Sequence, residues 1–196
     1  MSKENKSRYA ILGVLSQGQM SGYDIKKFIE ISISNFWSES YGQIYPLLKQ
    51  LTEEGLTSSH TEKQEGKPER YIYTLTDKGW DALREWLAEP AEYTVGRIEI
   101  LLKLFFGRHT AVATSIEHVQ QFRTLQVALL HKYAEIEKRI NEVCLDEAER
   151  LYSLITLNYG RRESEALVAW CDETLAILNT MVQVALSTQE GDMKHG

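Results

Sequence analysis

The sequence predicts a mostly helical fold in two parts, a head that combines helices with a two-stranded hairpin and an all-helical tail. Three observations predict it. Apolar residues recur at helical spacing through most of the chain, and a stretch from about residue 56 to residue 75 alternates instead. Pro90 interrupts the helical pattern between the two parts. We therefore expect domains at residues 1–90 and 91–196.

The head begins with two short helices. Tyr9, Leu12 and Leu15 lie at helical spacing, and the pattern stops at Gln17-Gly18-Gln19. Ser21-Gly22-Tyr23-Asp24 then has the form of a capping box, in which the hydroxyl and the carboxylate satisfy backbone donors at the start of a helix. A second helix is expected to follow this cap.

A third helix follows a second capping box, Ser40-Tyr41-Gly42-Gln43. Its apolar stripe recurs at i, i+3, i+4 and i+7, in Ile44, Leu47, Leu48 and Leu51. Pro46 removes one intrahelical hydrogen bond, so we expect the helix to start irregularly or one turn later. Gly55 is expected to close it.

The alternating stretch predicts a two-stranded hairpin. Residues 56–63 and 70–75 are rich in Thr, Ser, aromatic and β-branched residues, and Gln64-Glu65-Gly66-Lys67-Pro68 between them has turn chemistry. Thr76 then caps a fourth helix. Three helices, a hairpin and a closing helix form a winged helix-turn-helix, whose third helix enters the major groove of DNA.

The outer face of the third helix and the hairpin supply the groups that such a head uses on DNA. The Gln43 amide matches the edge of adenine. The Tyr41 and Tyr45 hydroxyls and the Lys49 ammonium suit phosphates. Gly42 lets the backbone approach the duplex. The predicted DNA-binding residues are Ser40, Tyr41, Gly42, Gln43, Tyr45, Lys49, Lys63, Lys67 and Arg70.

The net charge of −6 argues, by itself, against nucleic acid. Both halves of the chain are mildly acidic, so a DNA-binding head must gather its positive charge on one face. The alternative is a winged-helix protein-interaction module that does not bind DNA. Pattern alone leaves both readings open.

Several motifs closely resemble the PadR family of bacterial transcriptional regulators. In the head they are Ile11-Leu12-Gly13, Ser21-Gly22-Tyr23-Asp24-Ile25, residues 42–51, Glu54-Gly55-Leu56, Arg70, Tyr73-Thr74-Leu75-Thr76 and Gly79. In the tail, residues 101–107 and the set Gly160, Ala166 and Trp170 are similar to the longer subfamily with a C-terminal helical domain. The resemblance implies a homodimeric repressor that binds a palindromic operator in double-stranded DNA. It also implies release by a small effector such as a phenolic or drug-like aromatic compound, without assigning residues to it.

The sequence predicts four helices in the tail. A short one over 97–106 ends at Gly107 in a left-handed conformation, and a long one runs from about 113 to 143. A third ends at Gly160, and a fourth runs from about 163 to 186. The long helix has a heptad seam, and the last helix has an apolar stripe too wide for a two-helix hairpin. We expect a homodimer; the alternative is a self-contained monomeric bundle.

Aromatic residues near the predicted domain boundary are candidates for an effector pocket, namely Trp86, Tyr93, Phe105 and Trp170. The alternative is that they are ordinary core residues. The five histidines and two cysteines lack metal-ligand spacing, and there is no phosphate loop, dinucleotide fingerprint or serine elbow. We therefore expect no enzyme activity, no metal and no cofactor.

Localisation is predicted from two further features. The chain has no apolar run of about 18 residues, the length that would span a membrane. Its charged N-terminus lacks the apolar stretch of a secretory signal. We expect a cytoplasmic protein that does not enter the membrane.

Overall fold

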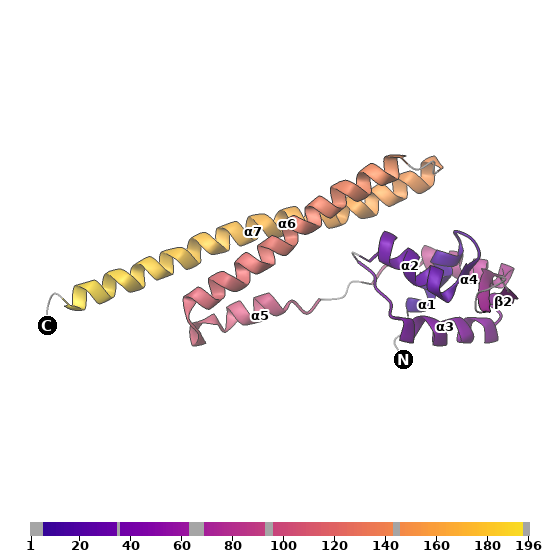
Figure 1. Ribbon diagram of the computed structural model, residues 1–196, viewed down its shortest axis with the longest axis horizontal. Coiled ribbons are helices and arrows are strands. Elements are labelled where there is room, and N and C mark those ends of the chain that lie inside the picture. Colours follow the sequence, from indigo (N-terminus) through magenta and orange to yellow (C-terminus); the bar gives the residue numbers. More distant parts are fainter. Residues whose placement is uncertain (1–5, 35, 63–68, 93–95, 143–145, 194–196) are drawn as a thin grey trace. The chain divides into compact units, whose positions relative to one another are not determined.

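The computed structural model describes residues 6–34, 36–62, 69–92, 96–142 and 146–193, with residues 185–193 described by their backbone alone. The chain divides into two compact units, residues 1–93 and 94–196. The boundary predicted at residue 90 lies close to this division. Figure 1 shows α1 to α4 and the small sheet in the first unit, the head, and α5 to α7 in the second, the tail.

The head is a helical domain with a small antiparallel sheet, which confirms the predicted fold class. Its elements in chain order are α1 (Ser7–Leu15), β1 (Met20–Ser21), α2 (Gly22–Ser32), α3 (Tyr41–Glu53), β2 (Thr57–Glu62), β3 (Arg70–Leu75) and α4 (Asp77–Ala88). The sheet has the order β1-β3-β2, so β3 is central. The hairpin of β2 and β3 was predicted, but the additional strand β1 was not, because two residues are too few to show alternation.

One apolar cluster holds the head together. It takes residues from all four helices, and its innermost side chains are at most 1% exposed: Ile11, Leu12, Ile25, Ile29, Ile44, Leu48 and Leu51. The predicted stripe on α3 is therefore confirmed as buried. Because it is buried, the opposite face of α3 is turned toward solvent.

The predicted caps form with one change at α3. The Ser21 backbone N–H donates to Asp24 Oδ2 at 3.1 Å, and Asp24 N–H donates to Ser21 Oγ at 3.2 Å. Gly55 closes α3 in the left-handed region at φ +73°. The helix starts directly after Ser40, which confirms the second capping box, and it contains Pro46, so the alternative of a start one turn later is wrong. Pro46 has no N–H to donate to the carbonyl of Gly42, and the helix tolerates this loss at its exposed face.

The tail contains α5 (Glu99–Phe105), the 3₁₀ turn η1 (Gly107–His109), α6 (Val112–Glu142) and α7 (Glu147–Met193). The predicted long helix is confirmed as α6. The predicted helix end at Gly160 is wrong, because α7, which is 47 residues long, continues through this position. A Cβ at Gly160 would lie 2.7 Å from the Tyr133 hydroxyl, so this glycine lets α6 and α7 approach closely.

Gly107 also differs from its prediction. Its φ is not in the left-handed region, and it begins η1 instead of ending α5 in an αL cap. A Cβ there would lie 3.3 Å from Ser115 Oγ of α6, so close packing again accounts for the glycine. Among the described residues, no helix is both long and apolar enough to cross a membrane.

Polar pairs fix the register of α6 against α7. Ser164 Oγ donates to Gln126 Oε1 at 3.0 Å in a buried position. Arg123 Nε donates to Asp172 Oδ1 at 2.6 Å, and Arg161 Nη1 donates to Glu137 Oε2 at 3.4 Å. Because buried polar groups tolerate few alternative partners, the buried Ser164–Gln126 pair selects one alignment of the two long helices, and the two more exposed ion pairs are consistent with it.

Candidate DNA-binding surface of the head

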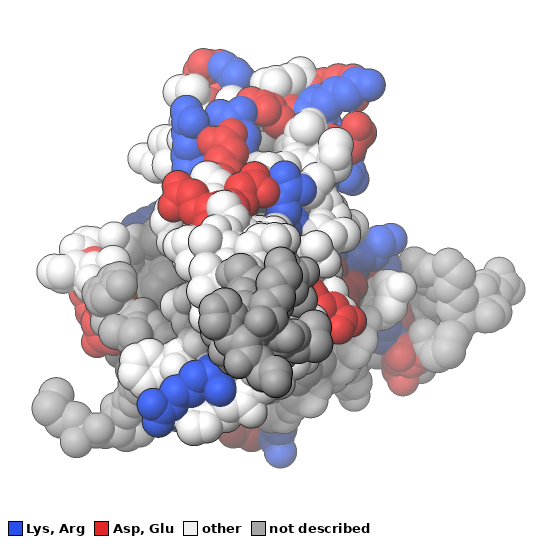
Figure 2. Space-filling view, turned by 90° about the vertical axis from the view of Figure 1, so that its left-hand side faces the viewer, with Lys and Arg blue, Asp and Glu red and all other residues white. Residues whose placement is uncertain are grey.

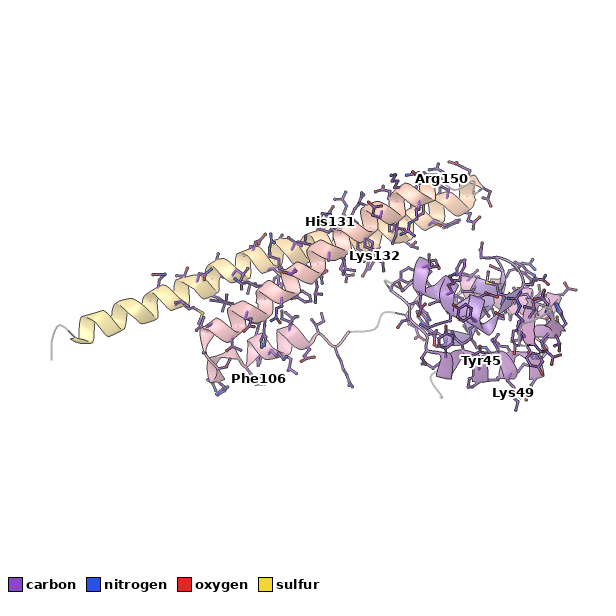
Figure 3. All side chains as sticks on the ribbon, viewed as in Figure 1. Tyr45, Lys49, Phe106, His131, Lys132 and Arg150 are labelled. Atoms are coloured by element: carbon purple, nitrogen blue, oxygen red, sulfur yellow. The ribbon has the colours of Figure 1, made fainter. Side chains whose placement is uncertain are left out.

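The outer face of α3 presents polar side chains at helical spacing. Tyr41 and Tyr45 are 43% and 50% exposed, and the Lys49 side chain is 80% exposed. Gly42 lies exposed between them. Figure 3 shows Tyr45 and Lys49 on the same helix. This face therefore carries hydroxyl donors, a cation and a small residue, which together suit a phosphate backbone.

A row of three tyrosines crosses from α2 to α3. The rings of Tyr23 and Tyr41 stack with centroids 6.5 Å apart, and those of Tyr41 and Tyr45 with centroids 6.4 Å apart. Lys26 Nζ lies 5.9 Å from the Tyr41 ring centroid. Desolvation, then the Glu30 carboxylate, raises the pKa of Tyr41 above its usual 10.0, so this hydroxyl stays protonated and can donate.

Tyr23 and Lys26 were missing from the predicted set. Both lie on α2, whose sequence pattern showed only a cap and an apolar stripe. The signal that could have found them is the helix-turn-helix geometry itself, because its first helix crosses the DNA backbone while the second enters the groove.

Gln43 lies in the first turn of α3, where its side-chain oxygen already accepts hydrogen bonds from Ser40. Its Oε1 accepts hydrogen bonds from the Ser40 backbone N–H at 3.0 Å and from Ser40 Oγ at 2.8 Å. A bidentate contact to adenine needs both the amide oxygen and the amide nitrogen. In this conformation only the Gln43 amide nitrogen is left to donate to a base.

Lys49 and Arg70 both have carboxylate partners. Lys49 Nζ lies 3.8 Å from Glu53 Oε1, an exposed pair that a phosphate can replace at little cost. Arg70 is held more closely, since its Nη2 lies 2.6 Å from Glu62 Oε2 and its Nη1 lies 3.6 Å from Asp24 Oδ2. Lys63 and Lys67 lie outside the described residues.

The candidate effector residues that the structure describes have different local surroundings. Trp86 stacks on Tyr9 inside the head, with ring centroids 4.7 Å apart. Trp170 of α7 meets Phe122 of α6 edge-on at 6.1 Å. Phe105 of α5 is 80% exposed and packs edge-on against Phe106. Tyr93 lies outside the described residues.

On the face seen in Figure 2, the coloured basic and acidic side chains are interspersed and form no field of one sign. Within the described ranges, no group of three or more His, Cys, Asp or Glu side chains is arranged to hold a metal ion. Cys171 is buried between α6 and α7, and this burial raises the pKa of its thiol.

Comparison with known proteins covers both units. The family model of the PadR-like transcriptional regulators matches residues 11–85, and that of the virulence activator alpha C-terminal domain matches residues 97–179. The chain is 32% identical to the negative transcriptional regulator PadR of Bacillus subtilis, over 88% of this chain and 97% of that protein.

Solved structures agree in fold. Bacillus subtilis PadR in complex with operator DNA matches at a TM-score of 0.82 and 28% identity, over 90% of this chain and 99% of that one. The structure of the same regulator in complex with p-coumaric acid matches at a TM-score of 0.75 and 26% identity, over 89% of this chain and 99% of that one. These proteins are DNA-binding transcriptional regulators and not enzymes. The chain belongs to the PadR-like family of transcriptional regulators, in its longer form with a C-terminal helical domain.

Proposed function

We propose that this DNA-binding regulator is a homodimeric repressor that reads a palindromic operator and is released by a small aromatic effector. The observation that carries the DNA part is the exposed polar face of α3 opposite its buried stripe. Tyr41, Gly42, Tyr45 and Lys49 face the duplex, and the wing residues Lys63 and Lys67 add phosphate contacts.

Ser40 and Gln43 have a shared role in this proposal. Their hydrogen bonds set the first turn of α3, which determines how the tyrosines approach the DNA. The Gln43 amide nitrogen remains available to donate to a base edge. Gln43 therefore contributes to both the helix start and the readout.

The dimer is inferred from apolar surface that the tail leaves uncovered. On α7, Tyr152, Ile155 and Tyr159 lie at i, i+3 and i+7 and are 72%, 64% and 66% exposed. On α5, Phe105 and Phe106 are 80% and 55% exposed. Exposed apolar side chains grouped in this way, on each of two separate segments of the tail, are typical of a protein interface. A second copy fits it best, because dimers bring two recognition helices to paired half-sites.

Release by an effector is supported by the solved p-coumaric acid complex of Bacillus subtilis PadR. In the present chain the exposed aromatic rings of α5 and the Trp170 region are candidates for contact with an aromatic acid. Titration of the full-length protein with p-coumaric acid, followed by tryptophan fluorescence and by operator release, tests this. Unchanged operator binding at saturating ligand would contradict it for this compound.

The DNA proposal is tested with the operator recovered from sheared genomic DNA and a scrambled duplex of the same composition. Lys49→Ala should weaken both duplexes alike and flatten the slope of log affinity against log salt by about 0.9. Lys103→Ala is the matched control, since Lys103 forms a similar i,i+4 pair with Glu99 on α5, outside the proposed surface. Equal effects of Lys49→Ala and Lys103→Ala on binding would show that Lys49 of α3 does not contact the DNA.

The dimer is tested by sedimentation of the full-length protein at micromolar concentration. Ile155→Lys should shift the protein toward monomer, whereas Asn179→Lys, an exposed residue on the side of α7 away from this stripe, should not. A wild-type protein that sediments as a monomer would refute the homodimer.

A further inference from the structure

The first turn of α2 contacts both elements that meet DNA. The Tyr45 ring from α3 lies over Gly22, where a Cβ would stand 2.7 Å from the ring carbon Cε1. Asp24, in the same turn, faces the base of the wing, with Oδ2 at 3.6 Å from Arg70 Nη1. One turn of helix therefore sits against the recognition helix on one side and the wing on the other.

Arg70 connects this turn to both strands of the wing. It begins β3 and pairs in register with Glu62, the last residue of β2. Its Nε and Nη2 each lie 2.6 Å from Glu62 Oε2, and its third nitrogen, Nη1, turns toward Asp24. The guanidinium thus faces two carboxylates, and its fork of donors suits such a bridge in a way that an ammonium cannot.

Asp24 is a fixed anchor for this bridge. Its Oδ2 accepts from the Ser21 backbone N–H at 3.1 Å and from Ser21 Oγ at 2.6 Å. Ser21 is itself paired with Ile72 in the sheet, so the anchor is tied to β3 as well as to α2. A small rotation at residues 62 and 70 is magnified along the hairpin, so a fixed base controls where the wing points.

We propose that Arg70 is a positioning residue for DNA recognition, which joins Glu62 to Asp24 and so holds the wing at a set distance from α3, and that it is not a phosphate ligand. This inference rests on the proposed DNA-binding function. It gives the wing base a role different from that of the wing-tip lysines, which supply charge.

Binding measurements on operator and scrambled duplex separate the two roles. Arg70→Lys keeps the charge but breaks the double bridge, and Glu62→Gln breaks it by removing a negative charge. We expect each to lower the ratio of operator to scrambled affinity by about two- to fivefold, the range for half-exposed ion pairs, with an unchanged salt slope. Glu53→Gln, which removes an equivalent charge from α3, is the control and should leave the ratio unchanged.

The phosphate-ligand alternative predicts opposite signs. Arg70→Gln would then flatten the salt slope by about 0.9, and Glu62→Gln would strengthen binding to every duplex by freeing the cation. Either result would overturn the proposal.

A measurement without DNA keeps this test independent of the proposed function. In the free full-length protein, Arg70→Lys should accelerate amide hydrogen exchange in β2 and β3 by about two- to fivefold and leave α1 unaffected. Unchanged exchange would refute the bridge even if the protein binds DNA. Faster exchange in a protein with no salt-dependent affinity for any duplex would instead refute the DNA function and keep the bridge.

Discussion

The head and the tail solve the problem of burying apolar surface in different ways. In the head, four helices and the sheet enclose one cluster of large aliphatic residues. In the described part of the tail, the buried apolar residues are Val119, Tyr133, Leu157 and Cys171, and the polar side chains of Ser115, Gln126 and Ser164 are buried beside them. The head is closed by its own chain, whereas the tail has a thin core with a specified register.

This difference follows from the number of layers in each unit. A helix buries its apolar stripe only where another element covers it, and two long helices cover one face of each other. Several of the remaining large apolar residues, among them Leu102 and Phe105 of α5 and Ile155 and Ile177 of α7, stay exposed within one chain. We infer that folding of the head is a property of the monomer and that the tail is completed by a second subunit.

The largest expected effect comes from separating the units. Residues 1–93 alone should keep a cooperative unfolding transition, because their core is local. Operator affinity should fall toward the non-specific level, a loss of about 4–10 kcal/mol, because one recognition helix acts alone. Calorimetry of the fragment measures its unfolding transition, and fluorescence anisotropy of labelled operator measures its affinity. A fragment that binds operator as tightly as the full chain would show that the tail does not build the dimer.

Core truncations come next and compare the same residue type in the two units. Leu48→Ala in the head removes a side chain that is 0% exposed and should cost about 2–5 kcal/mol. Leu157→Ala in the tail should cost less, about 1–2 kcal/mol, because its neighbours can move into the space. Denaturant unfolding followed by tryptophan fluorescence gives both values. A larger loss at Leu157 would contradict the thin-core description.

The sequence predicted the elements whose signals are local. The Ser21/Asp24 cap, the end of α3 at Gly55 and the apolar stripe of α3 all depend on residues within one or two turns. Prediction from the sequence was wrong where the role of a residue depends on a side chain far along the chain. Gly160 looks like a helix end but accommodates Tyr133 of α6.

The candidate site shows the same limit. The exposed face of α3 could be deduced from periodicity, because one buried stripe defines its opposite. The carboxylates facing Arg70 come from α2 and β2, and no spacing in the sequence indicates that they meet. That meeting depends on tertiary geometry, whereas the Gln43–Ser40 bonds belong to the local capping box that the sequence indicated.

Glycine substitutions test how rigid each unit is. At Gly79 in α4, a Cβ would lie 2.0 Å from the Leu56 carbonyl oxygen, a backbone atom, so Gly79→Ala should cost about 1–3 kcal/mol or more. At Gly160 the obstacle is the hydroxyl and ring edge of Tyr133, a side chain that is itself buried. Gly160→Ala should therefore destabilise the tail, but by less than Gly79→Ala costs the head, because a side chain can shift where a backbone carbonyl cannot and about 1 kcal/mol of helix propensity offsets part of the strain.

Gly13→Ala is the control for both glycines, because nothing lies within 4 Å of its added Cβ in α1. It should stabilise the head by up to about 1 kcal/mol. Thermal unfolding of the three variants gives the order. If Gly160→Ala proved more destabilising than Gly79→Ala, the tail would be the more rigid unit.

The smallest expected effect is the acid response of the head at Asp24. Hydrogen bonds from the Ser21 side chain first, and the charge of Arg70 among lesser causes, hold the pKa of Asp24 below its usual 3.8. A lowered folded-state pKa means that Asp24 contributes stability fully above the unfolded value and loses it as pH falls through the folded one. The head should therefore lose this contribution as the pH falls below about 4. In Asp24→Asn that part of the acid dependence should disappear, while Asp81→Asn, an exposed carboxylate on α4, should keep the wild-type profile. Urea unfolding between pH 3 and pH 6 measures it, and identical profiles for Asp24→Asn and wild type would show that the cap and the wing bridge do not depend on the Asp24 charge.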